Sequence, residues 1–432
     1  MRKQIVITLL LFRLGISLFS QVDFSGSADM AINTNIPESG DYESLLNPGN
    51  LMGISDLGLN SALIAKIDGG DEKTTFSAWF SLKEFPIGQA LLSAAYGDSI
   101  QEGGVFELTR TLGDTVFTMD LMRLSANVYL SDNISMEVGR QSMLTGYGYG
   151  WNPIDFANPL KNPLDPDAAL RGVDGLSFKI LPNFMSSLKI YGILPRDLLS
   201  SGLDYEEIKF GGELTLYFSG LEMKLAGFYD YDESVGSDAY TPSLGAGFMI
   251  DLWGVGLYSE AAVRKGSRNY FTDGGLVVQR KEEWLFSILA GLEYTFSNEL
   301  YGVVEYFYNG EGFNESERFE YRDSVMAFIG VMGSPTADLF SLYSPGYFAR
   351  HYIMLNLMQP LYSINTDINL AAIYSPDSGA LALMPSINYS FSGNFSGKLA
   401  YVGMLDLYDN DFSEVSALPV RHVISTVFTY SF

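Results

Sequence analysis

The chain has 432 residues, of which 47% are hydrophobic and 14% aromatic, and it contains no cysteine. Its formal net charge of −25 argues against a nucleic-acid partner, because binding phosphate requires a basic surface. The missing cysteines exclude a disulfide scaffold, zinc–thiolate sites and a cysteine nucleophile. After the first 20 residues, no apolar run approaches the ~18 residues with which a helix spans a bilayer.

The amino terminus has the pattern of a secretory signal peptide. A basic start at Arg2 and Lys3 is followed by an apolar run over 5–12 and by small residues at Ser17 and Ser20. We therefore expect residues 1–20 to be removed on export. Residues 21–432 show no linker or change of composition, so we expect them to form a single domain.

From residue 21 onward, short segments alternate between apolar and polar residues. Leu221, Met223 and Leu225, for example, alternate with Glu222 and Lys224. A period of two predicts strands with one apolar and one polar face. We predict about 18 strands, starting near residues 22, 53, 73, 115, 133, 172, 184, 205, 220, 242, 254, 283, 299, 347, 362, 381, 394 and 420.

The connections between these strands are sorted by length. Every second one is a tight turn with typical turn residues, such as Ser219–Gly220. The longer ones between them cover 35–52, 85–114, 143–171, 195–204, 232–241, 266–282, 311–346, 375–380 and 407–419. This asymmetry is typical of outer-membrane barrels, with short periplasmic turns and long external loops. The prediction is an all-β, transmembrane, up-and-down antiparallel β-barrel of 16–18 strands.

The carboxy terminus supports this prediction. Phe428, Tyr430 and Phe432 alternate with polar residues and end the chain on an aromatic residue. The ending resembles the assembly signal of outer-membrane β-barrel proteins. That resemblance implies the barrel-assembly machinery as a partner, a location in the bacterial outer membrane as a multi-pass β-barrel, and outer-membrane lipid around it.

The third long connection, 143–171, has the most unusual sequence, a Gly/Tyr alternation that leads from Gly146 to Trp151. Prolines restrict its backbone, including Pro153 and Pro159, while the glycines allow close packing around Trp151. We therefore expect this loop to be ordered, with these three residues serving its packing.

In its ordinal position this loop resembles the third external loop of general porins, which folds into the barrel and forms the constriction. The run from Arg171 to Leu176 that follows also resembles porin-type barrels of the alginate-export sort, over about 30 residues. The first resemblance implies that acidic loop residues face a basic wall across a narrow pore. The candidate constriction residues are Asp155, Asp165 and Asp167 of the loop and Arg123, Lys179, Lys189 and Lys209 of the wall. The alternative is a rigid cap over the barrel mouth or against a neighbouring subunit.

Charges on the polar strand faces nearly balance. If the apolar faces meet lipid, the lumen receives seven basic and six acidic residues: Lys66, Arg123, Lys179, Lys189, Lys209, Lys224, Lys398, Glu137, Glu213, Glu222, Glu293, Glu305 and Asp367. Most of the negative excess must then lie in loops and turns. It forms either a solvated exterior or a mouth that concentrates cations.

The sequence contains little that suggests catalysis. Its two histidines, His351 and His422, fall near external strand ends, and no phosphate-binding glycine loop appears. We expect no catalytic residue, cofactor or metal. The leading interpretation is a porin, either monomer or homotrimer, that passes small hydrophilic solutes or ions with a preference for cations.

Two other interpretations stay open. In a substrate-specific transporter, a plug would fill the lumen; a plug domain normally precedes the first strand, and here strand pattern begins at Val22. In a surface adhesin or structural barrel, the long connections over 85–114 and 311–346 would bind a host or matrix.

Overall fold

The computed structural model describes residues 21–37, 41–86, 88, 108–194, 208–231, 240–272, 278–332, 343–408 and 412–432. The predicted signal peptide over 1–20 lies outside these residues. So do the whole of the connection predicted at 195–204 and parts of those at 35–52, 85–114, 232–241, 266–282, 311–346 and 407–419.

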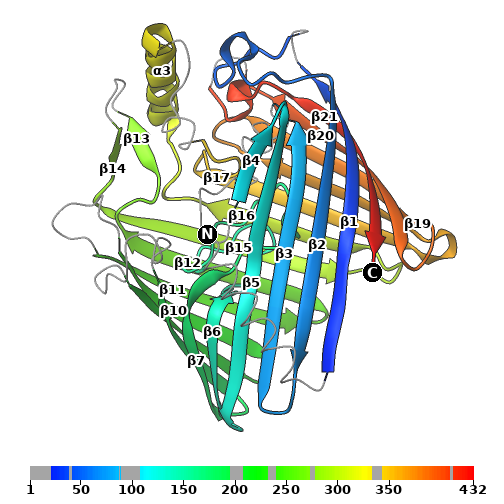
Figure 1. The fold of residues 1–432 in the computed structure, drawn as a ribbon. Coiled ribbons are helices and arrows are strands. Elements are labelled where there is room, and N and C mark those ends of the chain that lie inside the picture. Colours follow the sequence, from blue (N-terminus) through cyan, green and yellow to red (C-terminus); the bar gives the residue numbers. More distant parts are fainter. Residues whose placement is uncertain are drawn as a thin grey trace.

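Within the described chain, eighteen strands pair antiparallel with their neighbours in chain order (Figure 1). They are β1 (Gln21–Ile36), β2 (Leu57–Gly70), β3 (Thr74–Pro86), β5 (Thr115–Ser131), β6 (Ile134–Gln141), β7 (Val173–Asn183), β8 (Ser186–Ile193), β9 (Lys209–Phe218), β10 (Leu221–Tyr231), β11 (Tyr240–Leu252), β12 (Val255–Lys265), β15 (Trp284–Thr295), β16 (Tyr301–Tyr308), β17 (His351–Leu361), β18 (Thr366–Tyr374), β19 (Ala380–Ser390), β20 (Phe395–Asp406) and β21 (His422–Ser431).

The last strand pairs with the first and closes the barrel. The pairing of β21 with β1 runs from Ser27 opposite Ser431 to Ile36 opposite His422. Phe432 extends this seam, because its backbone exchanges two hydrogen bonds with Gly26, at 2.9 and 3.0 Å. Closure pairs the first and the last strand of the barrel, which would otherwise be its two edges. The predicted all-β, up-and-down antiparallel barrel is therefore confirmed, at the upper end of the expected strand number.

Short turns lie at one end of the barrel and the longer connections at the other, which we call the long-loop end (Figure 1). Ser219 and Gly220 both have positive φ, +44° and +92°, as the tight turn between β9 and β10 requires. The long-loop end carries further elements: β4 (Leu108–Leu112), β13 (Tyr270–Thr272), β14 (Val278–Arg280), α3 (Glu315–Met332) and the 3-10 turns η1 (Pro48–Asn50) and η5 (Val415–Ala417). The 3-10 turn η4 (Tyr362–Ile364) lies in a short connection.

The helix α3 stands where a loop is expected. Asn314 caps its first turn: its Oδ1 accepts from the Glu317 backbone N–H at 3.0 Å, and Glu317 accepts from the Asn314 N–H at 2.8 Å. This reciprocal pair is a capping box. The helix packs on the long-loop end (Figure 1). Among the described helices, none is both long and apolar enough to cross a membrane.

The strands present apolar side chains outward and polar or tightly packed ones inward. On β10, Leu225 and Tyr229 are exposed on the outer face, whereas Ala226 and Phe228 are buried on the inner one. The buried apolar residues gather inside the barrel and beneath the long-loop end. The core of this protein therefore lies within the ring of strands, packed around an inserted segment.

Candidate functional site

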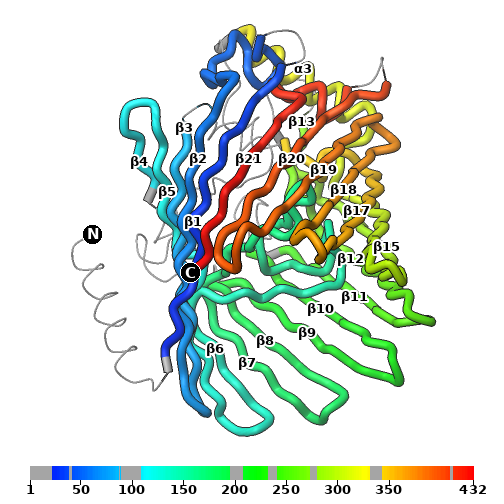
Figure 2. The backbone as a smooth tube through the Cα atoms, turned by 90° about the vertical axis from the view of Figure 1, so that its right-hand side faces the viewer, coloured from blue at the N-terminus to red at the C-terminus, as the bar shows by residue number. Residues whose placement is uncertain are grey.

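The inserted segment is the connection between β6 and β7, residues 142–172, which we call the lumen loop. Its path can be followed inside the ring of strands in Figure 2. Thr145 donates through its hydroxyl to Glu213 on β9 at 2.6 Å, and the Ile154 side chain packs against Gly245 on β11. Trp151 stacks on Phe307 of β16, with ring centroids 5.2 Å apart. The loop therefore lies against one half of the inner wall.

Two carboxylates of the wall hold the backbone of the lumen loop. Glu260 on β12 accepts from the N–H groups of Tyr147 and, at 3.0 Å, Gly148. Glu305 on β16 accepts from the N–H groups of Tyr149 and, at 2.8 Å, Gly150. Both carboxylates are buried, so these charge-assisted bonds replace the hydration they have lost.

A lysine of the loop adds a positive charge beside these carboxylates. The Lys161 ammonium donates to the carbonyl oxygens of Gly148 and Tyr149, at 2.9 Å each. Burial lowers the pKa of Lys161, and the nearby Glu305 and Glu260 oppose that shift. The alternation of glycine and tyrosine is thus bonded on one side by the wall and on the other by its own loop.

Glycine is needed in this stretch because the backbone approaches its neighbours closely. A Cβ on Gly148 would lie 1.8 Å from the Trp151 carbonyl oxygen and 2.4 Å from a methyl group of Leu289. Gly146 has φ +115°, and a Cβ there would lie 2.7 Å from a Glu260 oxygen. These positions explain why small residues alternate with tyrosine.

Trp151 anchors the loop to both the wall and the long-loop end. Its side chain is fully buried, and its indole N–H donates to the Gly346 carbonyl oxygen at 2.9 Å. Next to it, Pro153 is buried, whereas Pro159 is partly exposed. The structure thus places Trp151 and Pro153, two of the three predicted packing residues, in the buried part of the loop.

Asp155 braces the loop from within. Its carboxylate accepts from the Asn158 side-chain amide at 2.9 Å and from the Asn158 backbone N–H at 3.2 Å. Burial raises the pKa of Asp155 to about 6, against the opposing effect of the Asn158 bonds. The side chain is buried between loop and wall.

A cavity of about 530 Å³ separates the loop from strands β1–β3 and β17–β21. Its charged lining residues are Asp29, Lys83, Asp165, Asp167 and Lys398. Asparagine and serine side chains contribute most of the remaining polar lining: Asn33, Asn60, Ser61, Asn162, Asn356, Asn369, Ser386 and Ser425. The structure therefore brings Asp165 and Asp167 of the predicted set to this cavity.

The four basic residues predicted for the opposite wall lie elsewhere on the barrel. The Arg123 guanidinium stacks on Trp79 at 4.1 Å, and Lys209 forms an ion pair with Asp230 at 2.6 Å. Lys179 and Lys189 are cross-strand neighbours on β7 and β8. None of the four, and not Asp155, is among the described residues that line the cavity. The basic side chains at the cavity are Lys83 and Lys398.

Lys83 and Glu260 are two residues of the site that the sequence does not single out, although both lie at inward-facing strand positions of the same period. The sequence predicts Lys398 and Glu305 in the lumen, but it indicates no role for Glu305. The available signal was a lone acidic residue on an inward strand face between small or aromatic residues, as in Tyr258-Ser259-Glu260-Ala261-Ala262.

The described segments 41–54, 312–330, 343–350 and 412–420 pack together over the long-loop end, and we call them the cap. Glu414 accepts from the Gly346 N–H at 2.9 Å and from the Tyr352 hydroxyl at 3.3 Å. Burial raises the pKa of Glu414 to about 7. The Phe348 ring packs against Phe412 at 6.3 Å.

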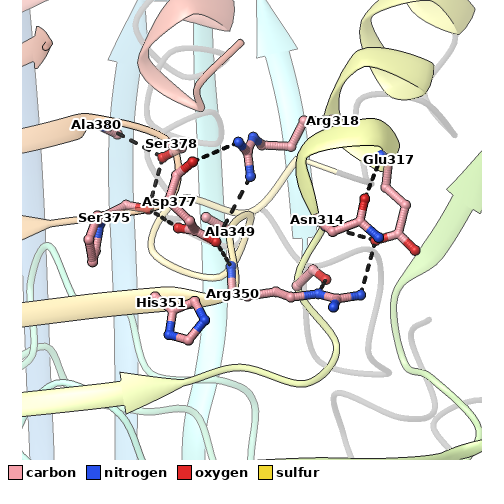
Figure 3. A network of polar contacts seen from close by, with 12 residues as sticks. Asn314, Glu317, Arg318, Ala349, Arg350, His351, Ser375, Asp377, Ser378 and Ala380 are labelled. Atoms are coloured by element: carbon pink, nitrogen blue, oxygen red, sulfur yellow. Dashed lines mark hydrogen bonds and ion pairs between the residues drawn. The ribbon is translucent and has the colours of Figure 1, made fainter. Parts of the chain in front are cut away.

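Two arginines tie the first turn of α3 into the cap, as Figure 3 shows. Arg318 donates to the carbonyl oxygens of Phe412 and Asp377 at 3.0 and 2.8 Å. Arg350 donates through its backbone to the Asp377 carboxylate at 3.1 Å and lies 3.4 Å from Glu317. The cap is therefore joined both to the β18–β19 connection and, through Gly346, to the lumen loop.

No family model matches the sequence, and no curated protein matches it. Among solved structures, the chain is similar to Salmonella typhi OmpF in complex with daunomycin, at 11% identity and a TM-score of 0.46, over 95% of this chain and 97% of that one. It is also similar to two mutants of the Rhodopseudomonas blastica porin, at 12% and 11% identity and TM-scores of 0.44 and 0.45, over 95% of this chain and 100% of each of those. By its own topology, the chain is a closed, up-and-down antiparallel β-barrel whose third long connection lies against the inner wall.

Proposed function

We propose that the protein is a bacterial outer-membrane porin through which small hydrophilic solutes and ions diffuse passively. One observation carries the proposal: a polar cavity of about 530 Å³ lies between the lumen loop and the opposite wall, inside a barrel whose outer face is apolar. An apolar exterior suits lipid, and a polar interior suits water and solutes. Such a channel selects by size and electric field and performs no chemistry.

We further propose that the lumen loop forms the constriction. Asp165 and Asp167 line the cavity from the loop, and Asp29 adds a third acidic group from β1. Lys83 and Lys398 line the same cavity from β3 and β20. Three acidic groups against two basic ones favour cations, and the overall charge of −25 acts in the same direction. In this proposal Asp155 braces the loop, and Arg123, Lys179, Lys189 and Lys209 act outside the constriction.

The proposed route to the membrane begins with export and removal of residues 1–20. Phe428, Tyr430 and Phe432 then act as the signal for the barrel-assembly machinery. The position of Phe432 supports this, since the terminal residue pairs with Gly26 in the closing seam and stacks on Phe24 at 5.4 Å. Assembly as a homotrimer stays a prediction.

Conductance of the refolded mature chain in a planar bilayer tests the proposal. We expect stable openings and, in a salt gradient, a reversal potential shifted toward that of the cation. The double variant Asp165→Asn/Asp167→Asn removes two charges from the cavity, so the shift should shrink. Asp71→Asn/Asp251→Asn is the matched control, because it removes two carboxylates from short turns outside the cavity, and an asparagine can still accept the turn N–H groups that bond to them. Equal reversal potentials for the double variant and the wild type would exclude the two aspartates from the constriction.

A second candidate is a substrate-specific transporter with a covered mouth. The cap favours it, because buried residues such as Leu46, Phe348 and Val415 form an apolar cluster over the long-loop end. Such a barrel would refold and resist heat, yet pass no steady current. That result would overturn the open porin.

A further inference from the structure

The cavity beside the lumen loop is lined by an amide group that has no hydrogen-bond partner within the described part of the chain. Asn356 on β17 is fully buried and lines the cavity. Neither its Oδ1 nor its Nδ2 bonds to any other residue that the structure describes. Leaving a buried polar atom unpaired costs about 1–3 kcal/mol, so native proteins satisfy such atoms with water or a ligand.

Two further amides of the same cavity have an unpaired oxygen. The Oδ1 atoms of Asn60 on β2 and Asn369 on β18 are also buried, and neither is paired within the described chain. Asn33 on β1 is nearly buried, and its Oδ1 accepts from the Ser425 hydroxyl at 2.6 Å. The four side chains come from β1, β2, β17 and β18, and all four line the cavity.

Amides indicate the kind of ligand that would satisfy them. A carboxamide offers donors and an acceptor at once, and a hydroxyl group does the same, so the two pair in either direction. A cation would leave the Asn356 Nδ2 unpaired, and an anion would leave the oxygens of Asn60, Asn356 and Asn369 unpaired. The charges at the cavity are mixed, with Lys83 and Lys398 beside the aspartates. The volume of about 530 Å³ lies within the roughly 300–1,000 Å³ that ligand pockets occupy.

We propose that this amide cluster, Asn33, Asn60, Asn356 and Asn369, is a binding subsite for neutral polyhydroxylated solutes of the sugar class. The inference rests on the proposed function for the route by which a solute arrives, but binding itself requires no current. Asn356 is the central residue, because both of its polar atoms are buried and unpaired. In the absence of solute, ordered water fills the same positions.

The test is a ligand-observed NMR titration of the refolded full barrel with sucrose. Asn356→Leu keeps the side-chain size and removes the amide, so sucrose should bind about tenfold more weakly. Asn127→Leu is the matched control, because Asn127 lies on the inner face of β5 at a separate cavity near the short-turn end. Sucrose affinity should be unchanged there. Glucose should also bind to the wild type, and sodium glucuronate, its charged analogue of similar size, should bind more weakly than glucose.

The outcomes separate the subsite from the porin. Sucrose binding that is absent, or equal in the wild type and Asn356→Leu, would mean that water alone occupies the amides, and the subsite would be refuted even if the barrel conducts. Sucrose binding that depends on Asn356 in a barrel without current would support the subsite and refute the open porin. In a conducting barrel, sucrose should also interrupt the current, and less so in Asn356→Leu.

Discussion

Replacing Glu260 by alanine should release the lumen loop from the wall. The Glu260 carboxylate accepts from two backbone N–H groups of the loop, those of Tyr147 and Gly148, and a third from Ile154 is long at 3.4 Å. A hydrogen bond to a charged group contributes about 1.5–3 kcal/mol, so losing the two shorter ones disfavours docking by about 3–6 kcal/mol. The equilibrium constant for undocking then rises at least about 100-fold.

Hydrogen–deuterium exchange of the loop peptide is the direct assay, because it reports the protection of those backbone amides. In Glu260→Ala, exchange within 142–172 should accelerate, and the single-channel current should fluctuate more, because the released loop moves into the cavity beside it. The exchange rate in Glu260→Gln should lie between those of the wild type and Glu260→Ala. The side-chain carbonyl of glutamine can still occupy the position of Oε1, which accepts both shorter bonds.

Glu293→Ala is the control for simple loss of a lumen charge. Glu293 is also an inward carboxylate, but it accepts from the Tyr301 hydroxyl at 2.6 Å on the barrel wall. Exchange of the loop peptide should be unchanged in this variant. Wild-type protection of the loop in Glu260→Ala would refute the reasoning that these carboxylate bonds hold the loop in place.

Three further predictions concern the loop anchor and the cap. Trp151→Ala removes a fully buried ring and its bond to Gly346, which should weaken loop docking by about 3–5 kcal/mol and be visible as faster exchange over 142–172. The pKa of Glu414 is about 7, against an ordinary 4.5, so between these pH values the folded cap retains a proton that the unfolded segment has lost. The stability of the cap should therefore fall by up to about 3 kcal/mol as pH rises from 4.5 to 7. Exchange over 412–420 at pH 5 and 8 measures this, and Glu414→Gln should abolish the difference; a wild-type cap that is more protected at pH 8 contradicts it. Arg318→Leu removes the guanidinium that donates to the Asp377 carbonyl oxygen, so limited proteolysis near α3 should be faster in that variant. Arg322→Leu is the control and should not change the rate, because among the described ion pairs the Arg322 guanidinium pairs only with the adjacent, exposed Asp323.

Much of the barrel could be predicted because its signals are local. Strand β10 begins at Leu221 and β15 at Trp284, each within a residue of the position that the alternation indicates. A period of two places residues on opposite faces whatever the rest of the chain does, and turn residues such as Ser219–Gly220 mark where a strand ends. The same local pattern predicted neither the α3 helix nor the β13–β14 hairpin, because these elements gain their stability from packing within the long-loop end.

The candidate site, too, could be predicted only in part. Residue order alone predicts that segment 143–171 is ordered, rich in glycine and packed through Trp151, and that the strands of the barrel have a polar inner face. It could not establish which charges meet, because neighbours across a barrel are separated by strand stagger and by the path of the inserted loop. Asp165 and Asp167 reach the cavity, whereas Asp155 turns inward to Asn158, and Lys83 and Lys398 occupy the wall where four other basic residues were expected. Only the closed barrel, in which Glu260 and Glu305 draw the loop to one side, decides where the open half of the lumen lies.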